Sequence, residues 1–220
     1  MKYKCLVLDH DDTVVQTEKT IGYPYFRDYI ERIRPGKTLS FPEYVRDCNN
    51  MVFADMCRDR WQMTEEELTE EYLGWKAYSR IHVPEVCDGI GDVIRRQKEA
   101  GGIVCVSSLS TREIIERDFL HHFGILPDAI YDYDLPIPQR KPNPYALEQI
   151  MADYSLSAEE ILMVDDMKLG WAMAAQLGID TAFAGWTKQE FPELSEEMRS
   201  ICNYAFLNPR DLERFLFDEE

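Results

Sequence analysis

The sequence predicts an α/β fold in which a parallel β-sheet is covered by helices and is interrupted early by a helical insertion. From about residue 86 onward, short apolar runs alternate with amphipathic stretches, which is the rhythm of βαβ units. One more apolar run, Cys5–Leu8, precedes this region, whereas strand signals fade between about residues 16 and 85. We therefore expect a core domain formed by residues 1–15 and 86–220, and a helical domain formed by residues 16–85.

The elements can be justified in chain order, beginning with the first strand at Cys5–Leu8. In the helical domain, Ser40 with Glu43 and Thr64 with Glu67 form capping-box patterns, which mark the starts of helices. In the core, buried strands are expected at residues 103–106, 161–164 and 179–183. Helices of the core are expected to begin near Ser110, Asn143, Ser157 and Asn208, where capping residues precede apolar stripes.

Composition excludes several classes of function. The formal net charge of −17 repels nucleic acid and anionic lipid, so neither is expected as a partner. No apolar run approaches the roughly 18 residues of a membrane span, and no export signal is visible. The six cysteines form no CxxC pair, which is typical of a protein of the reducing cytoplasm.

Polar residues with complementary chemistry follow the predicted strands. Asp9 and Asp11 end the first strand, Ser107 follows residues 103–106, and the pair Asp165 and Asp166 follows residues 161–164. Open α/β sheets bind ligands at the carboxyl ends of their strands, so these side chains are expected to converge. Converging carboxylates repel one another and require a cation, and hard oxygen ligands favour Mg²⁺.

A lysine completes this set of groups. Lys141 precedes a Pro-Asn-Pro helix start, and a local cation of this kind is needed for an anionic substrate to approach so acidic a chain. Aspartates, serine, lysine and paired acids together form a set suited to phosphoryl transfer.

The four motifs, in this order, resemble those of the haloacid dehalogenase superfamily, whose first strand ends in DxDx[TV]. The resemblance covers about residues 3–15 and 86–207 and implies a Rossmann-like, doubly wound core with the 16–85 segment as a helical C1 cap. It implies that Asp9 is the nucleophile and Asp11 the general acid and base. It further implies that Lys141 neutralises charge and that Ser107, or else Ser108, binds the phosphoryl group.

The resemblance also implies a Mg²⁺ site. The ion would contact Asp9, the backbone carbonyl of Asp11 and Asp166, with Asp165 acting through a metal-bound water. The sequence departs from the family at Asp12, where most members have glycine, and it lacks a further acid after the Asp165–Asp166 pair.

The function expected from these residues is a Mg²⁺-dependent phosphatase acting on a small phosphorylated metabolite. The nearest alternative is a sugar-phosphate mutase of the β-phosphoglucomutase type, which would use the same Asp9 and Asp11. A dehalogenase has no use for Asp11, and a phosphonate hydrolase would need a lysine in the cap. From a different class, the chain could be a noncatalytic metal- or phosphate-binding protein.

His10 is expected to point away from the two acids beside it and to be structural.

Overall fold

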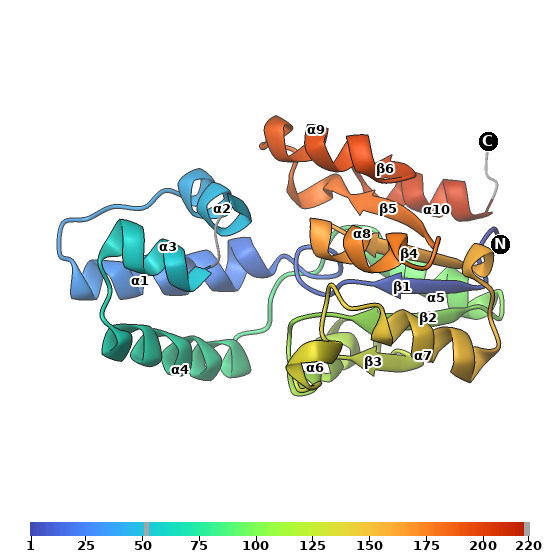
Figure 1. Ribbon diagram of the computed structural model, residues 1–220, viewed down its shortest axis with the longest axis horizontal. Helices are drawn as coiled ribbons and strands as arrows, with labels where there is room; N and C mark the ends of the chain where they lie inside the picture. Colours follow the sequence, from blue (N-terminus) through green and yellow to red (C-terminus); the bar gives the residue numbers. More distant parts are fainter. Residues whose placement is uncertain (51–52, 218–220) are drawn as a thin grey trace. The chain divides into compact units, whose positions relative to one another are not determined.

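The computed structural model describes residues 1–50 and 53–217, and the chain divides into two compact units (Figure 1). One unit comprises Met1–Val15 together with Val86–Glu220, and the other comprises Gln16–Glu85. Within the described residues, none of the helices combines the length and the apolar composition that a membrane crossing requires.

The first unit is built on a six-stranded parallel sheet with the order β3-β2-β1-β4-β5-β6. Its strands are β1 (Cys5–Leu8), β2 (Ile103–Ser107), β3 (Ala129–Tyr131), β4 (Ile161–Asp165), β5 (Asp180–Ala184) and β6 (Tyr204–Phe206). The strand order reverses at β1, which lies between β2 and β4. Ligands of open α/β sheets bind at such a switch point, outside the carboxyl ends of the strands. The predicted α/β fold with a doubly wound parallel sheet is confirmed.

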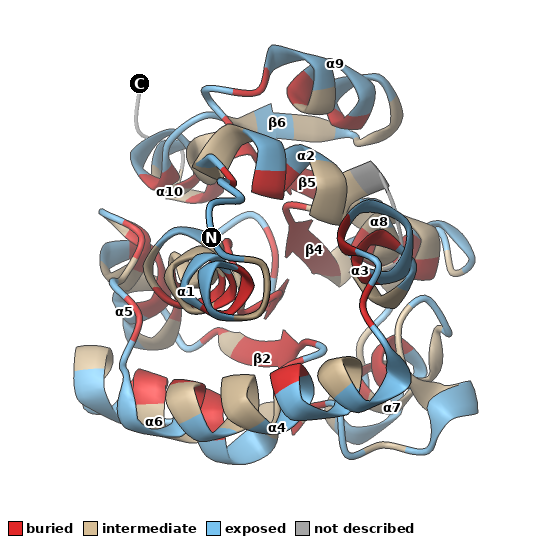
Figure 2. Cartoon of the chain, turned by 90° about the vertical axis from the view of Figure 1, so that its left-hand side faces the viewer, coloured by how far each residue is buried: buried red, intermediate tan, exposed pale blue. Residues whose placement is uncertain are grey.

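Helices cover both faces of this sheet. They are α5 (Ile90–Glu99), α6 (Arg112–Phe123), α7 (Tyr145–Tyr154), α8 (Lys168–Ala175), α9 (Pro192–Ile201) and α10 (Pro209–Phe217). Leu6 and Leu8 pack with α5, α6 and α10, whereas Cys5 and Val7 pack with α7 and α8. Successive side chains of a strand point to opposite faces, so β1 contributes to both apolar layers. Figure 2 shows β2 and β4 as buried for nearly their whole length, as expected of central parallel strands.

The second unit is the helical insertion between β1 and β2. It contains a short π-helix (Glu18–Gly22), α1 (Tyr23–Ile33), α2 (Phe41–Asn50), α3 (Phe53–Trp61) and α4 (Glu65–Ile81). Phe26 is buried at its centre, in contact with the rings of Tyr44, Phe53 and Trp61. The expected capping box of Thr64 and Glu67 is present at the start of α4. Aromatic side chains therefore contribute much of the core of this unit.

Sequence analysis missed two strands and misplaced two helix starts by one residue. The strands β3 and β6 have three residues each and lie at the two edges of the sheet, where so short a segment shows no periodicity. The prediction that Ser110 caps the next helix is wrong, because Thr111 is the N-cap residue of α6. The N-cap residue of α7 is likewise Pro144 rather than Asn143.

Candidate active site

The first component of the site is the turn that follows β1. The backbone N–H of Asp9 donates to the carbonyl of Val164 at 2.9 Å, which holds the end of β1 against β4. The chain then turns back, with the N–H groups of Val14 and Val15 donating to the carbonyl of His10 at 2.9 and 3.1 Å. The turn brings several carboxylates to the carboxyl edge of the central strand, and Asp9 is 8% exposed there.

Lys141 joins the turn to the end of β4. Its ammonium lies 2.9 Å from Asp9 Oδ1 and 2.6 Å from Asp165 Oδ2, and its side chain is 4% exposed. Burial by itself lowers the pKa of Lys141, but the carboxylates of Asp165 and Asp9 outweigh that effect and raise it. Burial raises the pKa of Asp9 to about 7, against the opposing effect of Lys141. The ammonium is therefore a fixed positive charge beside a carboxylate that burial makes hard to ionise.

Two carboxylates follow β4. Asp165 Oδ1 accepts a hydrogen bond from the N–H of Met167 at 2.8 Å, while its Oδ2 accepts the bond from Lys141. Helix α8 packs tightly here, because a Cβ at Gly170 would lie 2.2 Å from Asp165 Oδ2. Asp166 is 4% exposed, and burial raises its pKa well above the usual range. The end of β4 therefore presents two buried acids whose charges must be compensated.

The acids of β1 and β4 meet at a potential metal site. Among the described residues, oxygen atoms of Asp9, Asp165 and Asp166 all lie within 4.8 Å of one another, and all three side chains are buried. The raised pKa values of Asp9 and Asp166 are a second sign that this cluster carries more negative charge than burial favours. An all-oxygen donor set of this kind fits a hard divalent cation. The residues present are thus suited to hold a metal ion.

Asp11 faces a group of serines. Ser110 Oγ donates to Asp11 Oδ2 at 2.6 Å, and Ser108 Oγ lies 3.4 Å from the same oxygen. Ser107 ends β2 beside β1, yet its hydroxyl donates to the sulfur of Met173 at 4.0 Å. Sequence analysis assigned Ser110 to a helix cap and so missed its contact with Asp11, although its spacing of two from Ser108 was a visible signal.

His10 lies inside the core, close to two aspartates. Its imidazole is fully buried, with Nδ1 3.4 Å from Asp11 Oδ1 and Nε2 3.3 Å from Asp118 Oδ2. The expectation that it points away from Asp11 is therefore wrong. Burial acts to lower the pKa of His10, but the two carboxylates raise it to about 9.

A second buried lysine was also missed. Lys188 Nζ lies 2.8 Å from Asp12 Oδ2 and 3.1 Å from Asp166 Oδ2, and the Lys188 side chain is 3% exposed. The available signal was Asp12 itself, because a charged residue at a position usually held by glycine requires a counter-charge when it is buried.

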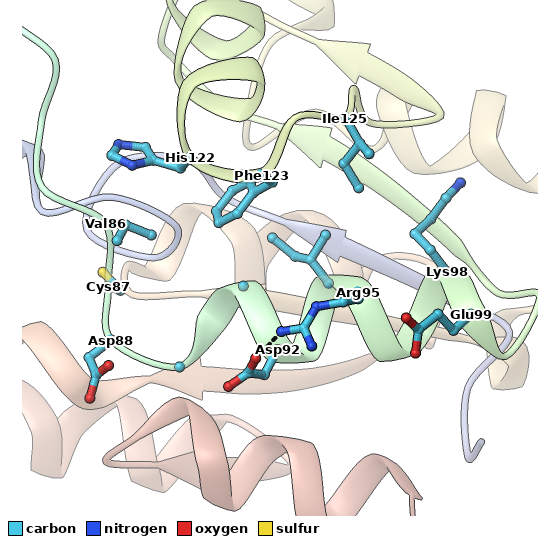
Figure 3. A pocket seen from close by; sticks show the side chains of 13 residues that line it. Val86, Cys87, Asp88, Asp92, Arg95, Lys98, Glu99, His122, Phe123 and Ile125 are labelled. Carbon is cyan, nitrogen blue, oxygen red and sulfur yellow. Dashed lines mark hydrogen bonds and ion pairs between the residues drawn. The ribbon is translucent and has the colours of Figure 1, made fainter.

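A separate hollow of about 550 Å³ lies along α5 and the end of α6 (Figure 3). Arg95, Lys98 and His122 are among the residues that line it. Within the described part of the chain, its lining includes none of the residues that the sequence singled out for catalysis.

The fold and the acidic site together define an α/β protein with a potential metal site at the carboxyl edge of its parallel sheet. The model of the haloacid dehalogenase-like hydrolase family matches residues 3–178, and the chain belongs to this family. The resemblance found in the sequence, including the helical insertion of the C1 type, is thus confirmed. No curated protein matches the chain.

Solved structures share this fold at low identity. A haloacid dehalogenase-like protein of unknown function from Agrobacterium tumefaciens has a TM-score of 0.81 and 15% identity over 98% of each chain. A putative phosphoglycolate phosphatase from Lactobacillus plantarum has a TM-score of 0.75 and 17% identity, over 96% of this chain and 98% of that one. CbbY from Rhodobacter sphaeroides, solved in complex with phosphate, has a TM-score of 0.70 and 15% identity over 96% of each chain.

Proposed function

We propose that this protein is a Mg²⁺-dependent phosphatase that hydrolyses a small phosphate monoester through an aspartyl-phosphate on Asp9. The observation that carries the proposal is the buried ammonium of Lys141, in contact with both Asp9 and Asp165. Family membership and the cluster of three buried acids support the same conclusion. The solved relatives named as phosphatases add support for the reaction class.

In the first step, a carboxylate oxygen of Asp9 attacks phosphorus and the bond from phosphorus to the leaving oxygen breaks. Asp9 must be ionised to attack, and its pKa of about 7 shows that burial opposes ionisation. Lys141 counters that effect by holding positive charge 2.9 Å from Asp9 Oδ1. The same charge stabilises the negative charge that the phosphoryl oxygens carry in the transition state.

Asp11 is the proposed general acid and base. It gives a proton to the leaving oxygen, and it later takes a proton from the water that attacks the aspartyl-phosphate, which releases phosphate and restores Asp9. The hydroxyl of Ser110, 2.6 Å from Asp11 Oδ2, fixes the orientation of this carboxyl group. Ser107, with Ser108 as the alternative, is proposed to donate to the phosphoryl group.

Asp9, Asp166 and the backbone carbonyl of Asp11 are the proposed ligands of Mg²⁺, with Asp165 acting through a water. The ion, when bound, supplies positive charge that neutralises the carboxylates and the phosphoryl oxygens. Both oxygens of Asp165 already accept bonds from the protein, which supports a further role for this residue in orienting Lys141.

The proposed substrate is a small phosphorylated metabolite of the cytoplasm. The net charge of −17 disfavours polyanionic partners, and a local ammonium such as that of Lys141 lets a small anion approach. Cys5, Cys57, Cys87 and Cys105 are buried as small apolar side chains, which supports a reducing compartment.

The test is release of inorganic phosphate from a panel of small phosphate monoesters, with and without Mg²⁺. We expect turnover of at least one ester that depends on the metal and is absent in the Asp9→Asn variant. A sugar-phosphate mutase would interconvert isomers while releasing little phosphate. No phosphate release from any ester in the presence of Mg²⁺ would contradict the proposal.

A further inference from the structure

The inference begins with Asp12, which replaces the glycine that most family members have before the threonine of the first motif. Its backbone φ of +53° lies in the left-handed region, which glycine adopts without strain and aspartate tolerates. Its side chain is buried, with the residue 4% exposed. A buried carboxylate is costly unless a counter-charge and hydrogen bonds compensate it. Asp12 therefore requires a positively charged partner from elsewhere in the chain.

The segment that follows β5 supplies this partner. Lys188 Nζ donates to Asp12 Oδ2 at 2.8 Å. Two neighbours of Lys188 also hold the same turn: Trp186 Nε1 donates to the carbonyl of Thr13, and Thr187 Oγ1 donates to the carbonyl of Asp12, both at 3.0 Å. One side chain and two backbone acceptors of the turn are thus fixed by three consecutive residues.

The backbone of Lys188 is itself fixed. Its N–H donates to the carbonyl of Gly185 at 3.1 Å, and its own carbonyl accepts from the N–H of Phe191 at 2.9 Å and from Ser195 Oγ at 3.1 Å. Lys188 is therefore held both at its backbone and at its ammonium, so its side chain is fixed inside the protein.

The same ammonium also contacts the candidate metal site, 3.1 Å from Asp166 Oδ2. A positive charge at this place repels a divalent cation and competes with it for the carboxylate. The carboxylate of Asp12 offsets that effect, because it pairs with Lys188 and cancels its charge. Among the described residues, the cluster of Asp9, Asp165 and Asp166 together with Lys141 then carries two net negative charges, the amount that one divalent cation neutralises.

We propose that Asp12 and Lys188 form a charge-neutral pair, in which Asp12 is a positioning residue that holds the Lys188 ammonium and prevents it from competing with the cation for Asp166. This proposal rests on the proposed function, because it concerns the metal site of that enzyme. It explains why an acid can stand at the position of the family's glycine without disturbing the site beside it. Partners of this kind, which act on metal ligands without binding the metal, typically change metal affinity by about 10–100-fold.

The test compares the wild type with Asp12→Gly and with the double variant Asp12→Gly/Lys188→Met. The metal affinity of each purified full-length protein is measured by isothermal titration calorimetry with Mg²⁺ and with Mn²⁺. We expect Asp12→Gly to bind the metal about 10–100-fold more weakly, because Lys188 is left to pair with Asp166. We expect the double variant to recover affinity to within about threefold of the wild type, since the competing ammonium is gone.

A matched control removes a different aspartate that pairs with lysine. Asp128 Oδ1 lies 2.5 Å from Nζ of Lys98, a residue that lines the hollow shown in Figure 3. Asp128→Asn changes the net charge by the same amount as Asp12→Gly. Its metal affinity is expected to equal that of the wild type. Melting temperatures without metal establish that each variant is folded.

The outcomes separate the two proposals. If the wild type binds neither metal, the metal-dependent function is refuted. If the wild type binds metal but Asp12→Gly binds it equally well, the charge-neutral pair is refuted. If Asp12→Gly and the double variant are weakened alike, the pair only stabilises the fold, and the inference is also overturned.

Discussion

Replacement of Asp9 by asparagine should abolish turnover and at the same time stabilise the metal-free protein. Asp9 is buried beside Asp165, and burial raises its pKa from 3.8 to about 7. Asparagine removes the charge that burial disfavours, but it cannot attack phosphorus to form an acyl-phosphate. Activity and stability should therefore change in opposite directions, as expected where a catalytic group is held in an unfavourable environment.

The magnitude follows from the pKa of Asp9. Between 3.8 and about 7, the unfolded chain has lost the proton that the folded chain still holds, so the folded state loses stability as pH rises through this window. At about 1.4 kcal/mol per pH unit, the raised pKa of Asp9 lowers the free energy of unfolding by about 2 kcal/mol at pH near 5 and by about 4 kcal/mol at pH near 8. The advantage of Asp9→Asn in the free energy of unfolding should grow with pH by that difference.

Urea unfolding followed by tryptophan fluorescence in metal-free buffer measures this advantage at both pH values. Asp28→Asn is a matched control, because the side chain of Asp28 is 71% exposed and its loss should leave the stability nearly unchanged at both. An Asp9→Asn variant that is less stable than the wild type near pH 8, or whose advantage does not depend on pH, would refute the reasoning. Retained turnover would refute the assignment of Asp9 as nucleophile.

Three further predictions concern the groups around Asp9. Lys141→Met should lower kcat by about 10²–10³-fold, because it removes the cation that stabilises the charge developing on the phosphoryl oxygens. Steady-state assays check this prediction, and a change in KM alone would contradict it. Ser110→Ala should lower kcat by roughly tenfold or more and should also lower the melting temperature, because it removes a buried hydrogen bond to a charged group that is worth about 1.5–3 kcal/mol. Equal activity would show that Asp11 does not need this hydroxyl. Gly170→Ala should destabilise the protein by about 1–3 kcal/mol in urea unfolding, because its Cβ would lie 2.2 Å from Asp165 Oδ2; an unchanged stability would mean that α8 moves away at no cost.

The site combines two buried lysines with acids from two strand ends. Lys141 pairs with Asp9 and Asp165, while Lys188 pairs with Asp12 and Asp166. Each lysine reaches the acids from a different segment, one before α7 and one after β5. This arrangement keeps several carboxylates close together inside the protein, where each alone would be driven to take up a proton.

Much of the fold and of the site could be predicted because the signals are local. The central strands are apolar runs buried on both faces, and their ends are marked by polar residues such as Asp9 and Asp165. The edge strands β3 and β6 could not be predicted, because three residues show no periodicity and pairing with a neighbour decides their conformation. His10 was misjudged because alternation along a strand does not continue into the turn that follows it.

The sequence by itself determined the α/β class, the helical insertion and the family, because hydrophobic periodicity and the order of short motifs are written along the chain. The tertiary structure alone decided which charges compensate one another. Asp12 and Lys188 are 176 residues apart, and Ser110 and Asp11 are 99 apart. No local pattern links such residues, because their contact arises only when parallel strands bring distant carboxyl ends to one edge of the sheet.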